Sequence, residues 1–189
     1  MHCVCMKSID NRKLLFLDIH DSNDLIHKVQ SLYEASFPED EQVPFEILLE
    51  QSKNDISDIY AIFDKDVFVG MLCTVYDADI VFLWYLAVEK SLQGQGYGSQ
   101  ILHDVANKFA SQRLILNIEE VDMHVIETVK RKQFYVNNGY KESGFKTEEY
   151  GVVYEMLSYR GKVTYAEYEH MMRKYSGDEV FERIYKLVE

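Results

Sequence analysis

The residues with the clearest chemical meaning are three glycines at alternate positions, Gly94, Gly96 and Gly98. They follow a very apolar run over residues 80–88 and precede a stretch whose apolar residues recur at helical spacing. Glycine weakens a strand or helix interior by roughly 0.5–1 kcal/mol relative to alanine. This cluster therefore indicates that something must lie close to the backbone.

A strand, a glycine loop and a helix in this order are typical of phosphate binding, because the first amides of a helix lack partners and carry partial positive charge. Two common patterns fail here. No lysine follows the glycines as the Walker loop requires, and Ser99 stands where the dinucleotide fingerprint needs its third glycine.

A third pattern, Q/R-x-x-G-x-G/A, is met by Gln93, Gly96 and Gly98, and a second segment at residues 132–140 reads KQFYVNNGY. With both segments at this separation, the sequence resembles the GNAT superfamily of acyl-CoA-dependent N-acyltransferases over roughly residues 13–158. The alternative is a structural loop that binds nothing.

The resemblance implies that the chain binds acetyl-CoA as a co-substrate. Backbone groups of Leu86 and Val88, where the central strand parts from its neighbour, would contact the pantetheine arm. The resemblance implies a pyrophosphate loop formed by Gln93, Gly94, Gln95, Gly96, Tyr97, Gly98 and Ser99.

Acyl transfer to an amine needs a neutral amine, donors for the oxyanion and a proton for the thiolate. Neutralising an amine with a lysine-like pKa at pH 7 costs about 4.6 kcal/mol. A backbone amide near Leu86 or Ala87 could stabilise the oxyanion. Tyr135 matches the tyrosine that in many family members lies beside the sulfur, although most of the 14 tyrosines are expected to be packing residues.

The proton acceptor is harder to assign, because Phe82 and Trp84 occupy the strand on which many members carry a glutamate. Glu119 and Glu120 are the nearest carboxylates along the sequence, and adjacent strand residues point to opposite faces, so at most one faces the acceptor. We choose Glu120 as the candidate base. The other interpretation is that both acids cap the next helix or remain solvated.

Two further positions have open interpretations. The acids of residues 39–41 (Glu39, Asp40, Glu41) either attract a cationic amine or stabilise the dipole of a helix that starts at Pro44. Thr128 stands where many members have an asparagine bonded to the pantetheine arm, which weakens the expected contact on that side.

Patterning predicts the elements that position these residues: a mixed, mostly antiparallel central sheet with helices on both faces and a splayed central strand pair. Expected strands cover residues 13–20, 58–64, 67–77, 80–88, 114–121 and a final hairpin over 140–160. Expected helices cover residues 24–37, a segment from Pro44, a segment after Gly98, 124–138, and a helical tail.

We divide the chain into an acetyltransferase domain, residues 1–160, and a C-terminal helical extension, residues 161–189. Thr164 and Glu167 form a capping box that opens the extension. Its apolar face packs either on its own domain or on a partner subunit in a homodimer.

A net charge of −12 disfavours nucleic acid and anionic membranes as partners. Three cysteines (Cys3, Cys5 and Cys73) without a disulfide framework, and no signal peptide, fit a cytoplasmic protein. Scattered histidines predict no metal site, and Cys3 and Cys5 beside His2 lack the further ligands that a soft metal needs. The functions that remain are a primary-amine N-acetyltransferase, a non-catalytic acyl-CoA sensor and an interaction module with the same fold.

Overall fold

The computed structural model describes residues 12–188, and these residues form one mixed α/β sheet with helices on both faces. Within that range eight strands lie in the order β1-β2-β3-β4-β5-β7-β6-β8. Among these strands only β4 and β5 run parallel, and the other neighbours are antiparallel. The strands are β1 (Leu15–Asp18), β2 (Ser57–Asp64), β3 (Val67–Asp77), β4 (Ile80–Val88), β5 (Arg113–Glu119), β6 (Lys141–Glu149), β7 (Val152–Tyr159) and β8 (Tyr185–Val188).

The helices begin close to the predicted positions. Ser22 caps the first one by accepting a hydrogen bond from the Leu25 amide at 3.3 Å. Pro44 precedes the second helix instead of occupying its first turn, because its ψ of 128° is extended. The helices are α1 (Asn23–Ser36), α2 (Phe45–Gln51), α3 (Tyr97–Lys108), α4 (Ile126–Asn137), α5 (Tyr165–Ser176) and α6 (Asp178–Ile184).

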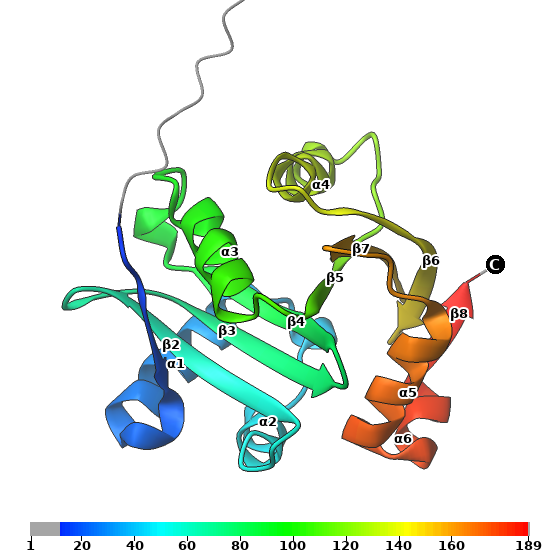
Figure 1. The fold of residues 1–189 in the computed structure, drawn as a ribbon, viewed down its shortest axis with the longest axis horizontal. Helices are drawn as coiled ribbons and strands as arrows, with labels where there is room; N and C mark the ends of the chain where they lie inside the picture. The colour runs from blue at the N-terminus through cyan, green and yellow to red at the C-terminus, as the bar shows by residue number, and fades with distance from the viewer. Residues whose placement is uncertain (1–11, 189) are drawn as a thin grey trace, which may run out of the picture.

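The helices divide between the two faces of the sheet (Figure 1), and each face has its own apolar core. The face of α1, α2, α5 and α6 buries side chains such as Leu48, Phe82 and Phe181. The face of α3 and α4 buries Leu83 and Ile101, with Tyr135 packed against it. Because residues alternate along β4, its unbroken apolar run fills both cores, as expected of a strand covered on both sides.

β4 carries an irregularity in its middle. Cys73 of β3 pairs with Tyr85, while the next residue, Thr74, pairs with Leu83, so Trp84 is an extra residue in the ladder. As a result Trp84 and Tyr85, although adjacent, both pack into the core on the face of α1, α2, α5 and α6.

β4 also parts from β5 directly after this point. The last residue pair between them is Leu83 with Leu116. Residues 84–88 of β4 and residues 117–119 of β5 therefore do not pair with each other. The backbone groups on these two facing edges are therefore open to a ligand. The splayed strand pair expected from the sequence is present.

The C-terminal segment differs from the expected helical tail, because it ends in a strand. After α6 the chain extends as β8, which pairs with β6 from Glu149–Tyr185 to Lys146–Val188. The edge of β6 has unpaired backbone groups that a further strand on that side satisfies, and this tertiary pairing overrides the helical spacing.

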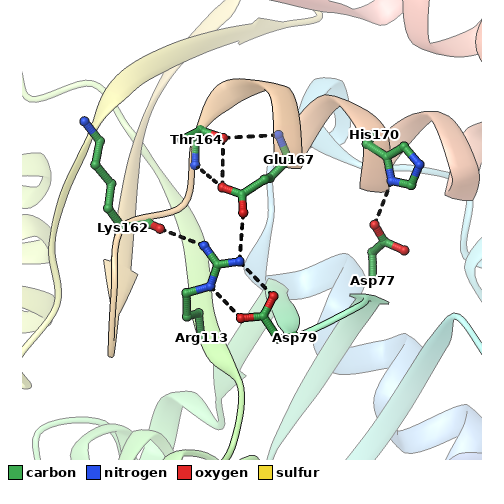
Figure 2. A network of polar contacts seen from close by, with 7 residues as sticks. All are labelled: Asp77, Asp79, Arg113, Lys162, Thr164, Glu167 and His170. Atoms are coloured by element: carbon green, nitrogen blue, oxygen red, sulfur yellow. Dashed lines mark hydrogen bonds and ion pairs between the residues drawn. The ribbon is translucent and has the colours of Figure 1, made fainter.

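Polar contacts also fasten the C-terminal segment to the sheet (Figure 2). Arg113 donates two hydrogen bonds to Asp79, at 2.8 and 2.7 Å, and one to Glu167 at 2.8 Å. The capping box of Thr164 and Glu167, predicted from the sequence, is present. His170 contacts Asp77 through Nδ1 at 2.7 Å, so α5 is joined to the end of β3.

Candidate functional site

The glycine loop leads directly into the N-terminus of α3. Gly94 and Gly96 have φ values of +75° and +87°, which side-chain-bearing residues rarely adopt, and Gly96 is the N-cap residue. A Cβ at either glycine would meet nothing within 4 Å, so the space beside the backbone is open.

The amides of the first turn of α3 are available to an anion. The Gln100 amide donates to the Gly96 carbonyl at 3.1 Å, so the helical pattern starts only there. The preceding amides, of Tyr97, Gly98 and Ser99, have no partner inside the helix. Open space, positive φ and free donors together fit a diphosphate group at this loop.

Gly98 has a different reason to lack a side chain. A Cβ at this position would lie 3.0 Å from Cζ of Phe134 on α4, tighter than an ordinary contact. Here the missing side chain leaves room for another helix, while the backbone amide of Gly98 still belongs to the first turn of α3.

Side chains of the loop hold its shape. Gln93 donates through Nε2 to the Val88 carbonyl at 3.1 Å, and Gln95 donates to the Ser91 carbonyl at 2.9 Å. Tyr97 donates its hydroxyl to Oδ2 of Asp64 at 3.0 Å. The Val88 carbonyl, expected to serve the pantetheine arm, is thus already bonded to the loop.

Arg12 brings a positive charge to the loop. Its Nη1 donates to the Gln95 carbonyl at 3.4 Å, and its guanidinium carbon lies 4.5 Å from the centre of the Tyr97 ring. A guanidinium at this loop adds positive charge near the N-terminus of α3. Arg12 was not predicted from the sequence, because it lies 83 residues before Gln95 with no local motif around it.

Tyr135 packs on the same apolar cluster as Leu86, Val88 and Tyr97, which brings these predicted residues to one side of the sheet. Its ring lies 5.0 Å from that of Phe134 and 5.9 Å from that of Tyr140. Burial raises the pKa of the Tyr135 hydroxyl to about 12, so the group holds its proton at neutral pH. A protonated phenol can donate to a leaving thiolate.

The structure places the two candidate bases differently. Glu120 is exposed, forms an ion pair with Lys146, and lines a hollow of about 380 Å³ that includes Glu142 and Glu155. Glu119 is in register with Tyr154 of β7, and directly opposite residues share a face. Glu119 therefore starts from the strand face of Tyr154, and its carboxylate forms an ion pair with Arg131 of α4 at 3.5 Å.

The turn between α1 and α2 is joined to side chains of β4 and β7. Tyr85 of β4 donates its hydroxyl to the backbone oxygen of Glu41 at 3.0 Å, and Tyr154 of β7 donates to Oε2 of Glu41 at 2.7 Å. Burial, followed by the hydrogen bond to Glu41, raises the pKa of Tyr154. Glu41 thus contacts side chains from β4 and β7, the two strands on either side of β5.

Glu149, at the end of β6, is a second carboxyl on this side that the sequence did not reveal. It accepts hydrogen bonds at Oε1 from the Tyr168 hydroxyl at 2.9 Å and from Thr147 Oγ1 at 3.2 Å. Burial raises its pKa to about 7. No local motif distinguishes Glu149 from Glu148, and only the packing of α5 does so.

Thr128, the departure from the family pattern, has a local role. Its hydroxyl accepts from the Asp122 amide at 3.1 Å and lies 2.9 Å from the Val125 carbonyl. The side chain therefore orders the start of α4.

Within residues 12–188, no three His, Cys, Asp or Glu side chains are placed to hold a metal ion. No helix of that range has the length and apolar content needed to cross a bilayer. His2, Cys3 and Cys5, for which the sequence predicts no metal site, lie outside the described residues, and Cys73 is a buried free thiol.

Comparison with known proteins agrees with this geometry. Residues 55–142 match the family model described as an acetyltransferase (GNAT) domain. Residues 55–142 thus match a GNAT acetyltransferase domain, which confirms the resemblance seen in the sequence. No curated protein matches the sequence.

Solved structures share the fold at low identity. A protein assigned to the GNAT acetyltransferases of Bacteroides thetaiotaomicron has a TM-score of 0.70 at 19% identity, over 86% of this chain and 94% of that chain. An aminoglycoside 6'-N-acetyltransferase complexed with coenzyme A has a TM-score of 0.62 at 18% identity, over 78% and 96%. A Vibrio cholerae spermidine N-acetyltransferase, in complex with CoA and spermine, has a TM-score of 0.59 at 12% identity, over 77% and 94%.

Proposed function

We propose that this protein transfers an acetyl group from acetyl-CoA to a primary amine by direct attack through a tetrahedral intermediate. The observation that carries the proposal is the combination of an open glycine loop at the N-terminus of α3 with the parted edges of β4 and β5. The first suits the diphosphate of coenzyme A, and the second suits its extended, amide-rich arm.

In this proposal the amides of Gly96, Gly98 and Ser99 bind the diphosphate, with Gln93, Gly94, Gln95 and Tyr97 shaping the loop. The backbone of Leu86, beyond the extra residue of β4, contacts the arm and offers a donor for the oxyanion. Tyr135 gives its proton to the departing thiolate.

A cationic acceptor is supported by charge. The chain carries a net charge of −12, and the Glu41 carboxylate lies beside Tyr154 at the turn between α1 and α2. Two of the similar structures are described as acetylating amines of this kind, an aminoglycoside and spermidine. The free thiol of Cys73 suits a reducing compartment, so we place the reaction in the cytoplasm.

The test is thiol release from acetyl-CoA by the full chain. The protein is incubated with acetyl-CoA and, in separate reactions, spermidine, kanamycin or a peptide with a free N-terminal amine. We expect thiol release above the hydrolysis background with at least one amine, and an acetylated product by mass spectrometry. Release with none of them would contradict the proposal.

One observation favours a second candidate, an acyl-CoA sensor. On the α1 face of the sheet, β4 carries Phe82 and Trp84 and no carboxylate. A sensor would bind CoA, show no turnover, and keep its CoA affinity in Tyr135→Phe. Turnover that falls steeply in Tyr135→Phe would exclude it.

A further inference from the structure

Glu149 is a carboxyl that the protein buries without a cation. The residue is 7% exposed. The titratable groups that interact with it come from the turn between α1 and α2, from β7, from α5 and from β8: Glu41, Tyr154, Tyr168 and Tyr185. None of these groups is basic, whereas buried carboxylates are ordinarily paired with a cation.

One oxygen of this carboxyl is held and the other is open. Both hydrogen bonds, from Tyr168 and Thr147, reach Oε1. Oε2 accepts no hydrogen bond from residues 12–188. It is also not one of the fully buried atoms without a partner, so part of its surface is accessible. An anchored carboxyl with one open oxygen is the arrangement that binding of a cationic group requires.

Glu149 lies on the side of the sheet that the turn between α1 and α2 contacts. Thr147 is in register with Tyr154, which is in register with Glu119 at the end of β5. Glu149 follows Thr147 by two residues and so shares its face. The hydrogen bond of Tyr154 to Glu41 places the second carboxylate on the same face.

We infer that Glu149, with Glu41 beside it, binds the ammonium group of the acceptor and takes the proton that must leave before attack. This inference rests on the proposed function. One proton moves from the ammonium nitrogen to Oε2 of Glu149 and on to solvent. The neutral nitrogen forms a bond with the thioester carbon, the C–S bond breaks with its electron pair on sulfur, and Tyr135 gives that sulfur a proton. The second proton of the nitrogen then replaces the proton that Tyr135 has given.

Tyr168 is then a positioning residue, and through it the C-terminal segment takes part in the reaction. Its side chain is fully buried in α5, and its hydroxyl donates to Glu149. This donor favours the ionised carboxylate and so lowers the pKa of Glu149 against the larger effect of burial.

These groups give a pH dependence with a definite sign. A base must be deprotonated to act, so kcat/KM should rise with pH through about 7, the pKa of Glu149. Removing the Tyr168 hydroxyl should raise that pKa further and move the rise to higher pH.

The experiment compares the wild-type protein with Glu149→Gln, Tyr168→Phe and the control Glu148→Gln. Glutamine keeps the shape of Glu149 and can still accept from Tyr168. The control removes the same charge one residue earlier, where the carboxylate pairs with Lys186. The rate of thiol release is measured from pH 5.5 to about 9 with acetyl-CoA and the fastest amine of the panel, and CoA binding is measured by calorimetry.

We expect Glu149→Gln to lower kcat/KM by about 100-fold or more and to remove the rise near pH 7, with CoA affinity unchanged. Glu148→Gln should behave as wild type. Equal rates and profiles in Glu149→Gln and Glu148→Gln would overturn the inference and leave the proposed function intact.

Two other outcomes are also decisive. If Glu149→Gln fails to fold, Tyr168→Phe carries the test: a rise moved to higher pH supports the inference, and an unmoved rise overturns it. If the wild-type protein releases no thiol with any amine of the panel, the proposed function fails and the inference fails with it.

Discussion

Glycine is required in the loop for two different physical reasons, one at Gly96 and one at Gly98. Gly96 has a φ of +87° with open space beside it, whereas Gly98 lacks a side chain because Phe134 packs against it. Only the first reason concerns the ligand directly.

Gly96→Ala should therefore weaken CoA binding, because a Cβ strains the backbone and intrudes on the anion site. We expect a loss of about tenfold or more in affinity by calorimetry, which corresponds to about 1.4 kcal/mol. Gly177→Ala is the matched control, since Gly177 has a φ of +83° and equally open space but lies between α5 and α6. An equal loss in both variants would show that strain alone weakens binding.

Tyr135 and Tyr140 form a second pair for comparison. Their rings lie 5.9 Å apart, but the Tyr140 hydroxyl is fully buried without a partner among the described residues. Tyr135→Phe should lower kcat by about 100-fold with little change in CoA affinity, because only a proton donor is lost. Tyr140→Phe should leave kcat unchanged, and a similar fall in both variants would assign the effect to packing.

The sequence was informative about residues that form local motifs. Gln93, Gly96, Gly98 and Tyr135 are predictable from the sequence, because their neighbours along the chain specify the pattern. Glu149 is not predictable in this way, because its burial depends on the packing of α5. The contact residue of that helix, Tyr168, lies nineteen residues further along the chain.

At the scale of elements, the opening between β4 and β5 depends on how closely β3 holds β4. Gly70 of β3 faces the backbone of β4, and a Cβ at this position would lie 2.3 Å from the Ala87 carbonyl oxygen. This is an essentially forbidden contact with a backbone atom.

Gly70→Ala should force the two strands apart next to Leu86 and Val88. We expect a loss of about 1–3 kcal/mol in the free energy of unfolding, as for overpacked cores. Urea unfolding measures it, and calorimetry should show weaker CoA binding as well. Unchanged stability would contradict the close approach of the two strands.

Most elements followed from patterning alone, including the strands expected over residues 58–64 and 67–77, which the structure has as β2 and β3. The strand β8 did not, because its pairing depends on the free edge of β6. The extra residue Trp84 was not predicted either, since a register shift between strands leaves no mark in one strand's own sequence.

At the scale of the whole molecule, the C-terminal segment is joined to the sheet by strand pairing, a shared core and ionic contacts. Tyr168, Met171 and Phe181 are buried in the same cluster as Phe82 of β4. We propose that residues 161–189 form an extension of the acetyltransferase domain that docks on its own chain, and that its removal exposes this core.

The ionic contacts should make the fold sensitive to acid. Hydrogen bonds from Arg113 lower the pKa of Asp79 and, together with Thr164, lower that of Glu167 to about 2 from an ordinary 4.5. Carboxyls with lowered pKa stabilise the fold above their unfolded pKa and lose that contribution as pH falls. Between pH 5 and about 2, wild-type stability should fall more than that of Arg113→Gln in thermal unfolding. Parallel curves would contradict the role of this network.

The central claim is that the amides at the start of α3 bind the diphosphate of coenzyme A while β4 and β5 hold its arm between them. A crystal structure of the full chain with coenzyme A tests this most directly. We expect phosphate oxygens within hydrogen-bond distance of the amides of Gly96, Gly98 and Ser99, and the arm along Leu86. Coenzyme A bound elsewhere, or a gap between β4 and β5 filled by side chains of the protein, would contradict it.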